Sequence, residues 1–255
     1  MIATIALEQL TPESVSRHGV VRIEAGKLLS AEELVEITGR VGKPKAFGLA
    51  KYRPDGFPAE ATLIDTHGDG MTAAPRGFGE GWHQDSTFLA NPPEFTVLHA
   101  LDVPRCGGDT LFADTRPALP ELLESDLEAL KKLSLEHSVH GSYRIALSDV
   151  GRRLDEIREN LPVTRHPMMF QHPRVGATLL LSPLYTKDSL DPQIRPLFDR
   201  VLQAVIKGQI VHRWTAGEIL IWDNRVVLHA ATPYLGEERR RLIRTVAHDL
   251  HEAVS

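Results

Sequence analysis

A histidine and a carboxylate stand two residues apart in the segment Trp82-His83-Gln84-Asp85. Residues two apart on a β-strand face the same side, so His83 and Asp85 could both reach one metal ion. Two histidines and one carboxylate on one face of an octahedron leave open positions that suit Fe(II) oxygenases. With 12 histidines and 34 acidic residues in the chain, such a pair also arises by chance, and a second one occurs at His67-Gly68-Asp69.

Two later segments could complete a site around this pair. Gly107-Gly108-Asp109-Thr110 allows a tight turn in which Thr110 offers its hydroxyl to an anion, although an ordinary hairpin turn is the simpler local interpretation. Arg240 and Arg244 are an even number of residues apart, so on one strand they share a face with Leu242 and could point into a pocket. A solvated edge strand with basic residues is the alternative.

These residues must be positioned by a predominantly β fold with flanking helices. We expect helices from Ser30, whose capping box opens a helix stopping near Gly42, over Pro117–Glu136, and from Asp191-Pro192 onwards. The buried stripe of the last helix is predicted to be Ile194, Leu197, Phe198, Val201, Leu202 and Val205. Strands are expected at residues 61–64, 95–100, 179–181, 218–222, 226–229 and 242–248. Many short strands with few helices indicate a β-barrel or jelly roll, and neither nucleotide-binding fingerprint is present.

The length fits one large domain or two small ones, and the composition is that of an ordinary globular protein; the resemblance described below implies one domain over residues 1–255. A net charge of −5 argues against a nucleic-acid partner. The single cysteine, Cys106, indicates a reducing compartment, and the first residues do not resemble a signal peptide. No stretch is apolar enough to span a membrane, so we expect a soluble, cytoplasmic protein.

The order of these residues resembles that of the taurine dioxygenase and chlorophenoxyacetate dioxygenase (TauD/TfdA) family of Fe(II)/2-oxoglutarate oxygenases. His83-x-Asp85 is followed after 24 residues by Thr110, after a further 118 by His229, and after 10 more by Arg240. The segments WHQDSTF, PPEFTVLHALDVP, GGDTLFAD and IWDNRVVLHAATPY also resemble family segments. The similarity runs from about residue 30 to residue 248 and excludes His67 and Asp69, which lack this spacing.

The resemblance implies a double-stranded β-helix, a cupin-like jelly roll, with a metal at one open end. His83, Asp85 and His229 match the Fe(II) ligands, and Thr110 and Arg240 match the residues that hold the distal carboxylate of 2-oxoglutarate. This pairing is chemically apt, because a planar guanidinium binds a carboxylate through two parallel hydrogen bonds.

The resemblance also implies roles for residues around this set, with two departures. Arg244 matches a position that binds the acidic group of the primary substrate in several members, so the substrate would be its counter-ion; a purely structural pairing with Asp223 or Asp249 is the alternative. The segment 222–224 is expected to support the fold beside His229. The loop at 43–52 lacks the histidine that helps to bind sulfonate, and Gly79 stands where the family has asparagine. Taurine itself is therefore not the expected substrate.

The expected activity is oxidation, most simply hydroxylation, of an unactivated C–H bond in a small anionic substrate, with O2 consumed and succinate and CO2 released. Desaturation or oxidative cleavage on the same scaffold, a non-catalytic cupin-like binding protein and a zinc hydrolase are the alternatives. The partners expected are a small molecule and no membrane, with a homo-oligomer left open. His99 is expected to be a satisfied core histidine, and Cys106 to have a structural role. His140, Tyr143 and Arg144 are expected in a surface loop, with substrate contact as the alternative. His166 and His172 could mimic a metal cluster, but no carboxylate is spaced to join them.

Overall fold

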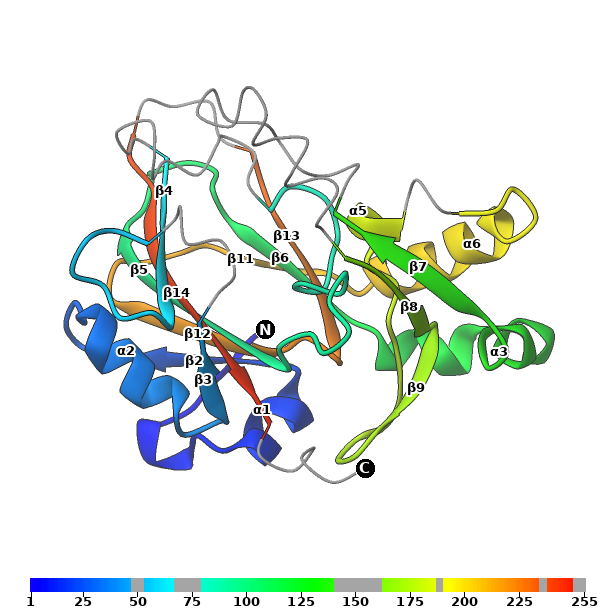
Figure 1. Ribbon diagram of the computed structural model, residues 1–255, viewed down its shortest axis with the longest axis horizontal. Helices are drawn as coiled ribbons and strands as arrows, with labels where there is room; N and C mark the ends of the chain where they lie inside the picture. Colours follow the sequence, from blue (N-terminus) through cyan, green and yellow to red (C-terminus); the bar gives the residue numbers. More distant parts are fainter. Residues whose placement is uncertain (47–52, 67–78, 140–161, 187–189, 234–237, 250–255) are drawn as a thin grey trace.

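The computed structural model describes residues 1–46, 53–66, 79–139, 162–186, 190–233 and 238–249 (Figure 1). Two β-sheets form its centre, a seven-stranded major sheet and a three-stranded minor sheet. The major sheet runs in the order β1 (Ala3–Thr4), β2 (Val20–Glu24), β12 (Glu218–Asp223), β5 (Phe95–Asp102), β14 (Arg241–His248) and β3 (Lys43–Lys45), with β4 (Ala61–Asp65) also paired to β14. The minor sheet runs in the order β11 (Ile210–His212), β6 (Thr110–Asp114) and β13 (Val227–Ala231).

Two further pairs of antiparallel strands extend from this core. One pairs β7 (Ser134–Ser138) with β8 (Val163–Pro167), and the other pairs β9 (Met169–His172) with β10 (Gly176–Leu179).

The alternation of side chains along β12 divides the protein into layers. Ile219 and Ile221 pack into a cluster on the helix-covered face of the major sheet. Leu220 and Trp222 point to the opposite face and join Phe112 of β6 in the space between the two sheets. Because successive strand residues face opposite sides, a continuously apolar strand such as β12 must be covered on both faces. The two facing sheets form the double-stranded β-helix that was predicted.

Two N-terminal helices cover the outer face of the major sheet. Helix α1 (Pro12–His18) begins at a Thr11 cap and α2 (Ala31–Thr38) at a Ser30 cap, whose side chain accepts the Glu33 N–H in the predicted capping box. Helix α2 ends at Thr38, earlier than the predicted end near Gly42.

The outer face of the minor sheet is covered by α6 (Arg195–Ile206), which lies on the right of Figure 1. Phe198, Val201 and Val205 are buried there, and the predicted partners in the stripe are partly buried beside them. The prediction that this helix starts at Asp191-Pro192 was wrong. The Asp191 carboxylate accepts the Gln193 N–H, and this local turn occupies the residues before Arg195.

The predicted helix over Pro117–Glu136 is also wrong. The segment forms a 3-10 helix, η3 (Arg116–Glu121), then α3 (Glu124–Leu130), and then enters β7. Pro120 lies inside η3, and Leu122 and Leu123 both adopt extended backbone, so the apolar spacing does not belong to one helix. The last predicted residues, up to Glu136, pair with β8 instead.

The strands predicted at residues 61–64, 95–100, 218–222, 226–229 and 242–248 are present within one or two residues of their expected ends. The strand predicted at 179–181 ends at Leu179, although Leu181 is fully buried as well. Within the described part of the chain, no helix is both long and apolar enough to cross a membrane.

Candidate metal centre and adjoining pocket

His83, Asp85 and His229 come together although 143 residues separate the last two in the chain. His229 lies on β13, and His83 joins that strand through an isolated antiparallel bridge. The backbone N–H of each histidine donates to the other's carbonyl oxygen at 2.9 Å. One potential ligand atom from each of the three residues lies within 4.8 Å of the other two, and all three side chains are buried.

The rings of the two histidines are oriented in different ways. His83 Nδ1 lies 2.9 Å from the Gly81 carbonyl oxygen, which can only accept, so Nδ1 carries the proton and Nε2 is left as a ligand. Nε2 of His83 lies 3.7 Å from Asp85 Oδ1, and Nε2 of His229 lies 3.8 Å from Asp85 Oδ2. The His229 ring is held by packing, since its centroid lies 4.8 Å from that of Trp222.

Asp85 is fixed by a network from the major sheet. The Thr96 hydroxyl donates to Asp85 Oδ2 at 2.7 Å, and Asn224 donates to Thr96 Oγ1 at 2.9 Å. The Asn224 side-chain oxygen accepts the Asp85 backbone N–H at 3.3 Å. The Arg244 guanidinium reaches the same carboxylate, with Nη2 3.1 Å from Oδ2.

The electrostatics of the cluster favour neutral imidazoles and an ionised carboxylate. Burial lowers the pKa of His229 to about 3 and also lowers the pKa of His83. Burial by itself would raise the pKa of Asp85, but Arg244 and the two histidines hold it below its ordinary value. Two unprotonated imidazole nitrogens and one carboxylate oxygen are a donor set that fits Fe(II).

The segment Trp222-Asp223-Asn224 supports the cluster only in part as predicted. Trp222 packs against His229, but Asn224 supports Asp85 through the hydrogen bonds described above. Asp223 points away from the cluster and accepts hydrogen bonds from Ser16 and from Arg225.

A pocket opens next to the three candidate ligands, between the two sheets. It is lined by Ile64, Gly79, His83, Asp85, Leu98, Thr110, Trp222, His229, Ala231, Arg240, Leu242 and Arg244. The structure therefore brings all six candidate site residues of the sequence analysis to one pocket. Its walls are mainly apolar, and its polar groups are concentrated at the candidate ligands, Thr110 and the two arginines.

Thr110 and Arg240 are held in this pocket by groups behind them. The Trp214 indole N–H donates to Thr110 Oγ1 at 3.0 Å, and Arg240 Nε donates to the Gly108 carbonyl at 3.0 Å. Gly108 has a backbone φ of +68° and a Cβ there would lie 3.1 Å from Arg240 Cδ, so the predicted turn serves a close approach.

Arg240 and Arg244 share the inward face with Leu242, as the even spacing predicted. The alternative of a solvated edge strand is wrong, because β14 pairs with β5 on one side and with β3 and β4 on the other. Both arginines are 6% exposed.

Sequence reasoning missed three residues of the site. Thr96 is a polar residue in the apolar first half of β5, and this was the signal that could have identified it. Trp214 carries no local signal. Tyr185 of α5 (Pro183–Thr186) lies edge-on to the His83 ring at 5.8 Å, a contact formed only in the tertiary structure.

The other candidate residues are accounted for separately. His99 is a satisfied core histidine, since its Nε2 accepts the Leu29 N–H and its Nδ1 donates to the Glu218 carbonyl. Cys106 is free and exposed. His172 is buried, and its Nε2 lies 3.0 Å from Asp223 Oδ2. The predictions for His67, Asp69, His140, Tyr143 and Arg144 lie outside the described residues.

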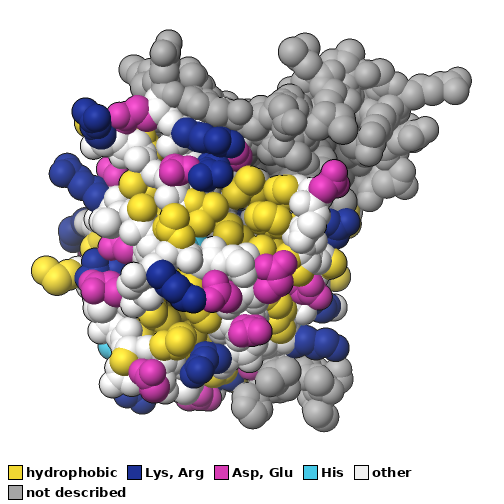
Figure 2. Space-filling model, turned by 90° about the vertical axis from the view of Figure 1, so that its left-hand side faces the viewer, with side chains coloured by type: hydrophobic (Ala, Val, Ile, Leu, Met, Phe, Trp, Pro, Cys, Tyr) yellow, Lys and Arg dark blue, Asp and Glu magenta, His cyan; other side chains and the backbone are white. Residues whose placement is uncertain are grey.

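The surface shows charges of both signs. On the face that Figure 2 shows, the described Lys and Arg side chains are interspersed with Asp and Glu, and hydrophobic side chains gather in the middle. The described side chains on this face therefore form a surface of mixed charge.

Comparison with known proteins gives a consistent result. The sequence profile described as Taurine catabolism dioxygenase TauD, TfdA family matches residues 7–246. The (S)-phenoxypropionate/alpha-ketoglutarate-dioxygenase of Sphingobium herbicidovorans is 31% identical over 228 residues, which cover 83% of this chain and 76% of that protein. The alpha-ketoglutarate-dependent 2,4-dichlorophenoxyacetate dioxygenase of Cupriavidus pinatubonensis is 32% identical over 176 residues, covering 66% of this chain and 60% of that protein.

Solved structures show the same fold. The crystal structure of a taurine dioxygenase from Burkholderia xenovorans matches with a TM-score of 0.72 and 23% sequence identity, covering 98% of this chain and 87% of that one. At this identity the likeness concerns the fold alone. It agrees with the double-stranded β-helix described above.

Proposed function

The chain belongs to the TauD/TfdA family of Fe(II)- and 2-oxoglutarate-dependent dioxygenases, and on this premise we propose that it hydroxylates an unactivated C–H bond of a small anionic substrate. One oxygen atom of O2 would enter succinate and the other the hydroxylated product, with CO2 released from 2-oxoglutarate. The observation that carries the proposal is that the His83, Asp85 and His229 cluster opens into the same pocket as Thr110 and Arg240. We assign residues 1–255 to one oxygenase domain.

His83 and His229 would hold Fe(II) through Nε2, and Asp85 through its carboxylate. The support is the donor set itself: two imidazoles kept neutral by burial, and a carboxylate kept ionised by its neighbours. The bound metal would supply the reaction of O2 with 2-oxoglutarate that oxidises the substrate. The protein residues bind and orient the reactants and exclude water from the pocket.

Thr110 and Arg240 would bind the distal carboxylate of 2-oxoglutarate. Arg240 is buried in a mainly apolar pocket, where a charge-assisted hydrogen bond to a carboxylate is strong. The apolar side chains of Leu98 and Leu242 line the same pocket and would pack against the methylene groups of the co-substrate.

Arg244 would bind the acidic group of the primary substrate. It lines the same pocket as Arg240, which directly precedes β14, and lies beside the candidate metal ligand Asp85. The two relatives named above act on phenoxypropionate and dichlorophenoxyacetate, both carboxylates. We therefore favour a carboxylate-bearing substrate for this protein. A cytoplasmic location and a homo-oligomer stay predictions.

Succinate release tests the proposal. Purified protein is incubated with Fe(II), ascorbate, 2-oxoglutarate and a panel of small carboxylates, sulfonates, sulfate esters and amino acids, with iron omitted as the control. We expect iron-dependent succinate release that one class of anion stimulates, with an oxygen-18 label from O2 in the product. Hydroxylation, desaturation and cleavage are distinguished by the mass of that product. Binding of 2-oxoglutarate without any succinate would support a non-catalytic binding protein instead.

A further inference from the structure

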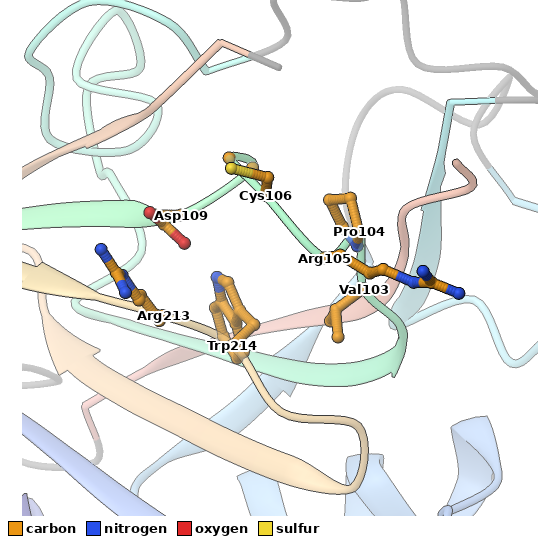
Figure 3. Close-up of a pocket in the computed structure, with 9 residues that line it drawn as sticks. Val103, Pro104, Arg105, Cys106, Asp109, Arg213 and Trp214 are labelled. Carbon is orange, nitrogen blue, oxygen red and sulfur yellow. The ribbon is translucent and has the colours of Figure 1, made fainter. Parts of the chain in front are cut away.

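Trp214 separates the pocket beside the metal cluster from a second cavity. This second cavity measures about 190 Å³ and is lined by Val103, Pro104, Arg105, Cys106, Gly107, Gly108, Asp109, Arg213 and Trp214. Figure 3 shows the Trp214 indole standing between Val103 on one side and Asp109 and Arg213 on the other. On its other side the indole N–H donates to Thr110 Oγ1, which lines the pocket of the metal cluster.

The chemistry of this hydrogen bond fixes the direction of the Thr110 proton. An indole N–H can only donate, so the Thr110 oxygen must be the acceptor. The hydroxyl has one hydrogen of its own, and no protein group among the described residues accepts it. A buried hydroxyl that already accepts from one side is therefore prepared to donate into the pocket.

Both partners of this hydrogen bond are held rigidly. The backbone of Thr110 pairs with His212 of β11 and with Ala231 of β13. Trp214 follows two residues after His212, and the two rings meet edge-on with centroids 5.0 Å apart. His212 is itself fixed by the Glu218 carboxylate, 3.1 Å from its Nε2.

We propose that Trp214 is a positioning residue for 2-oxoglutarate: its indole N–H holds the Thr110 hydroxyl so that the hydroxyl proton points at the distal carboxylate of the co-substrate. This inference rests on the proposed function, in which Thr110 and Arg240 bind that carboxylate. The backbone of Gly108, which lines the second cavity, holds Arg240 in the same way through its carbonyl. Both anchors of the co-substrate are thus oriented from the side of the second cavity.

Trp214→Phe tests the proposal, because phenylalanine keeps a ring at this position and removes the N–H. The dissociation constant of 2-oxoglutarate is measured anaerobically by titrating the Fe(II)-loaded protein and following the visible charge-transfer band. We expect about fivefold weaker binding of 2-oxoglutarate, the loss of one orienting hydrogen bond. A 2-oxo acid of equal length without the distal carboxylate, 2-oxopentanoate, should bind both proteins equally. Equal weakening of the two acids would show a merely structural role and overturn the proposal.

A double-mutant cycle with Thr110→Val identifies the path of the effect. If Trp214 acts through Thr110, the double variant should bind 2-oxoglutarate no more weakly than Thr110→Val alone. A full additional fivefold loss on the Thr110→Val background would mean that Trp214 acts independently of Thr110, and the proposal would be wrong.

A measurement on the native tryptophan covers the case in which Trp214→Phe does not fold. The indole N–H resonance of Trp214 is followed by NMR with Zn(II) in place of Fe(II). Adding 2-oxoglutarate should shift this resonance in the wild-type protein and not in Thr110→Val, and an unchanged wild-type resonance would overturn the proposal. If the wild-type protein does not bind 2-oxoglutarate, the proposed function fails as well. If the wild-type protein and Trp214→Phe bind 2-oxoglutarate equally well, only the proposed role of Trp214 fails.

Discussion

The guanidinium of Arg244 lies 3.1 Å from the carboxylate of Asp85, measured from Nη2 to Oδ2. The sequence analysis predicted that Arg244 would take its counter-ion from the substrate, with Asp223 or Asp249 as the alternative partner. Both of those aspartates instead bind Arg225. Arg244 therefore links a candidate metal ligand to the wall of the pocket, and if the proposed roles hold, substrate binding and metal binding would be coupled at this side chain.

Arg240 and Arg244 form a matched pair of variants, because both are buried arginines that line one pocket, Arg240 from the residue before β14 and Arg244 from β14 itself. We expect Arg240→Gln to raise the half-saturating concentration of 2-oxoglutarate roughly a hundredfold, since a buried carboxylate loses a charged partner at a cost of about 3 kcal/mol. Arg244→Gln should raise that of the primary substrate at least about tenfold and change that of 2-oxoglutarate little.

Steady-state kinetics at saturating Fe(II) measures the half-saturating concentrations of 2-oxoglutarate and of the primary substrate for both variants. The affinity for iron is measured separately, because Arg244 contacts Asp85. A collapse of 2-oxoglutarate binding in Arg244→Gln, or a neutral substrate, would contradict the assignment.

His83→Ala and His229→Ala should each abolish turnover, because two remaining ligands do not hold the metal in place. Anaerobic addition of Fe(II) and 2-oxoglutarate should give a weak visible charge-transfer band in the wild-type protein and in His18→Ala, whose histidine is exposed at the end of α1. Near-native turnover and an intact band in either ligand variant would show that the ligand assignment is wrong.

Thr96→Val should weaken metal binding by roughly 10- to 100-fold, as is typical when a group that orients a metal ligand is lost. Valine has nearly the shape of threonine, but it removes the hydroxyl that donates to Asp85. The matched control is Thr245→Val, which removes another buried hydroxyl, the partner of Thr38, on the same sheet. Urea denaturation of the metal-free proteins should find the two variants similarly stable. Calorimetric titration with the metal should find only Thr96→Val deficient in metal affinity.

The metal-free protein should lose stability as the pH falls below about 6.5, the ordinary pKa of histidine. Burial lowers the pKa of His137 and of His229 to about 3, so between pH 6.5 and 3 these residues bind protons when unfolded but not when folded. Each then lowers the free energy of unfolding by up to about 1.4 kcal/mol per pH unit.

Urea denaturation with a chelator between pH 7.5 and 4.5 checks this slope. The pKa values of Asp85 and Asp223 are lowered in the folded protein, so both carboxylates stabilise it at higher pH. This contribution to the free energy of unfolding is lost only below about pH 4, where unfolded carboxyl groups take up protons. His137→Gln should reduce the slope in the histidine window, and an unchanged slope would mean that His137 is charged in the folded protein.

The sequence was sufficient for the strands β4, β5, β12, β13 and β14 and for the parity of their side chains, whereas β2, β6 and β11 of the same two sheets were not predicted. The even spacing of Arg240, Leu242 and Arg244 predicted that they face one pocket from β14 and the residue before it, because strand geometry has a fixed period of two. Helix boundaries were less predictable. The spacing of leucines after Pro117 suggested one long helix, whereas the backbone of Leu122 and Leu123 is extended and the final residues pair with β8. That pairing is a long-range contact with no trace in the local pattern.

What the sequence determined by itself was the set of residue types and their order, which named the candidate ligands His83, Asp85 and His229. The tertiary structure alone decided how each is held: His83 by a backbone bridge to His229, and Asp85 by Thr96 and Arg244. Such contacts depend on the registers of strands far apart in the chain and on burial, which together set distances and pKa values. Residue type and spacing fix which groups can react, whereas packing fixes where they meet and in which protonation state.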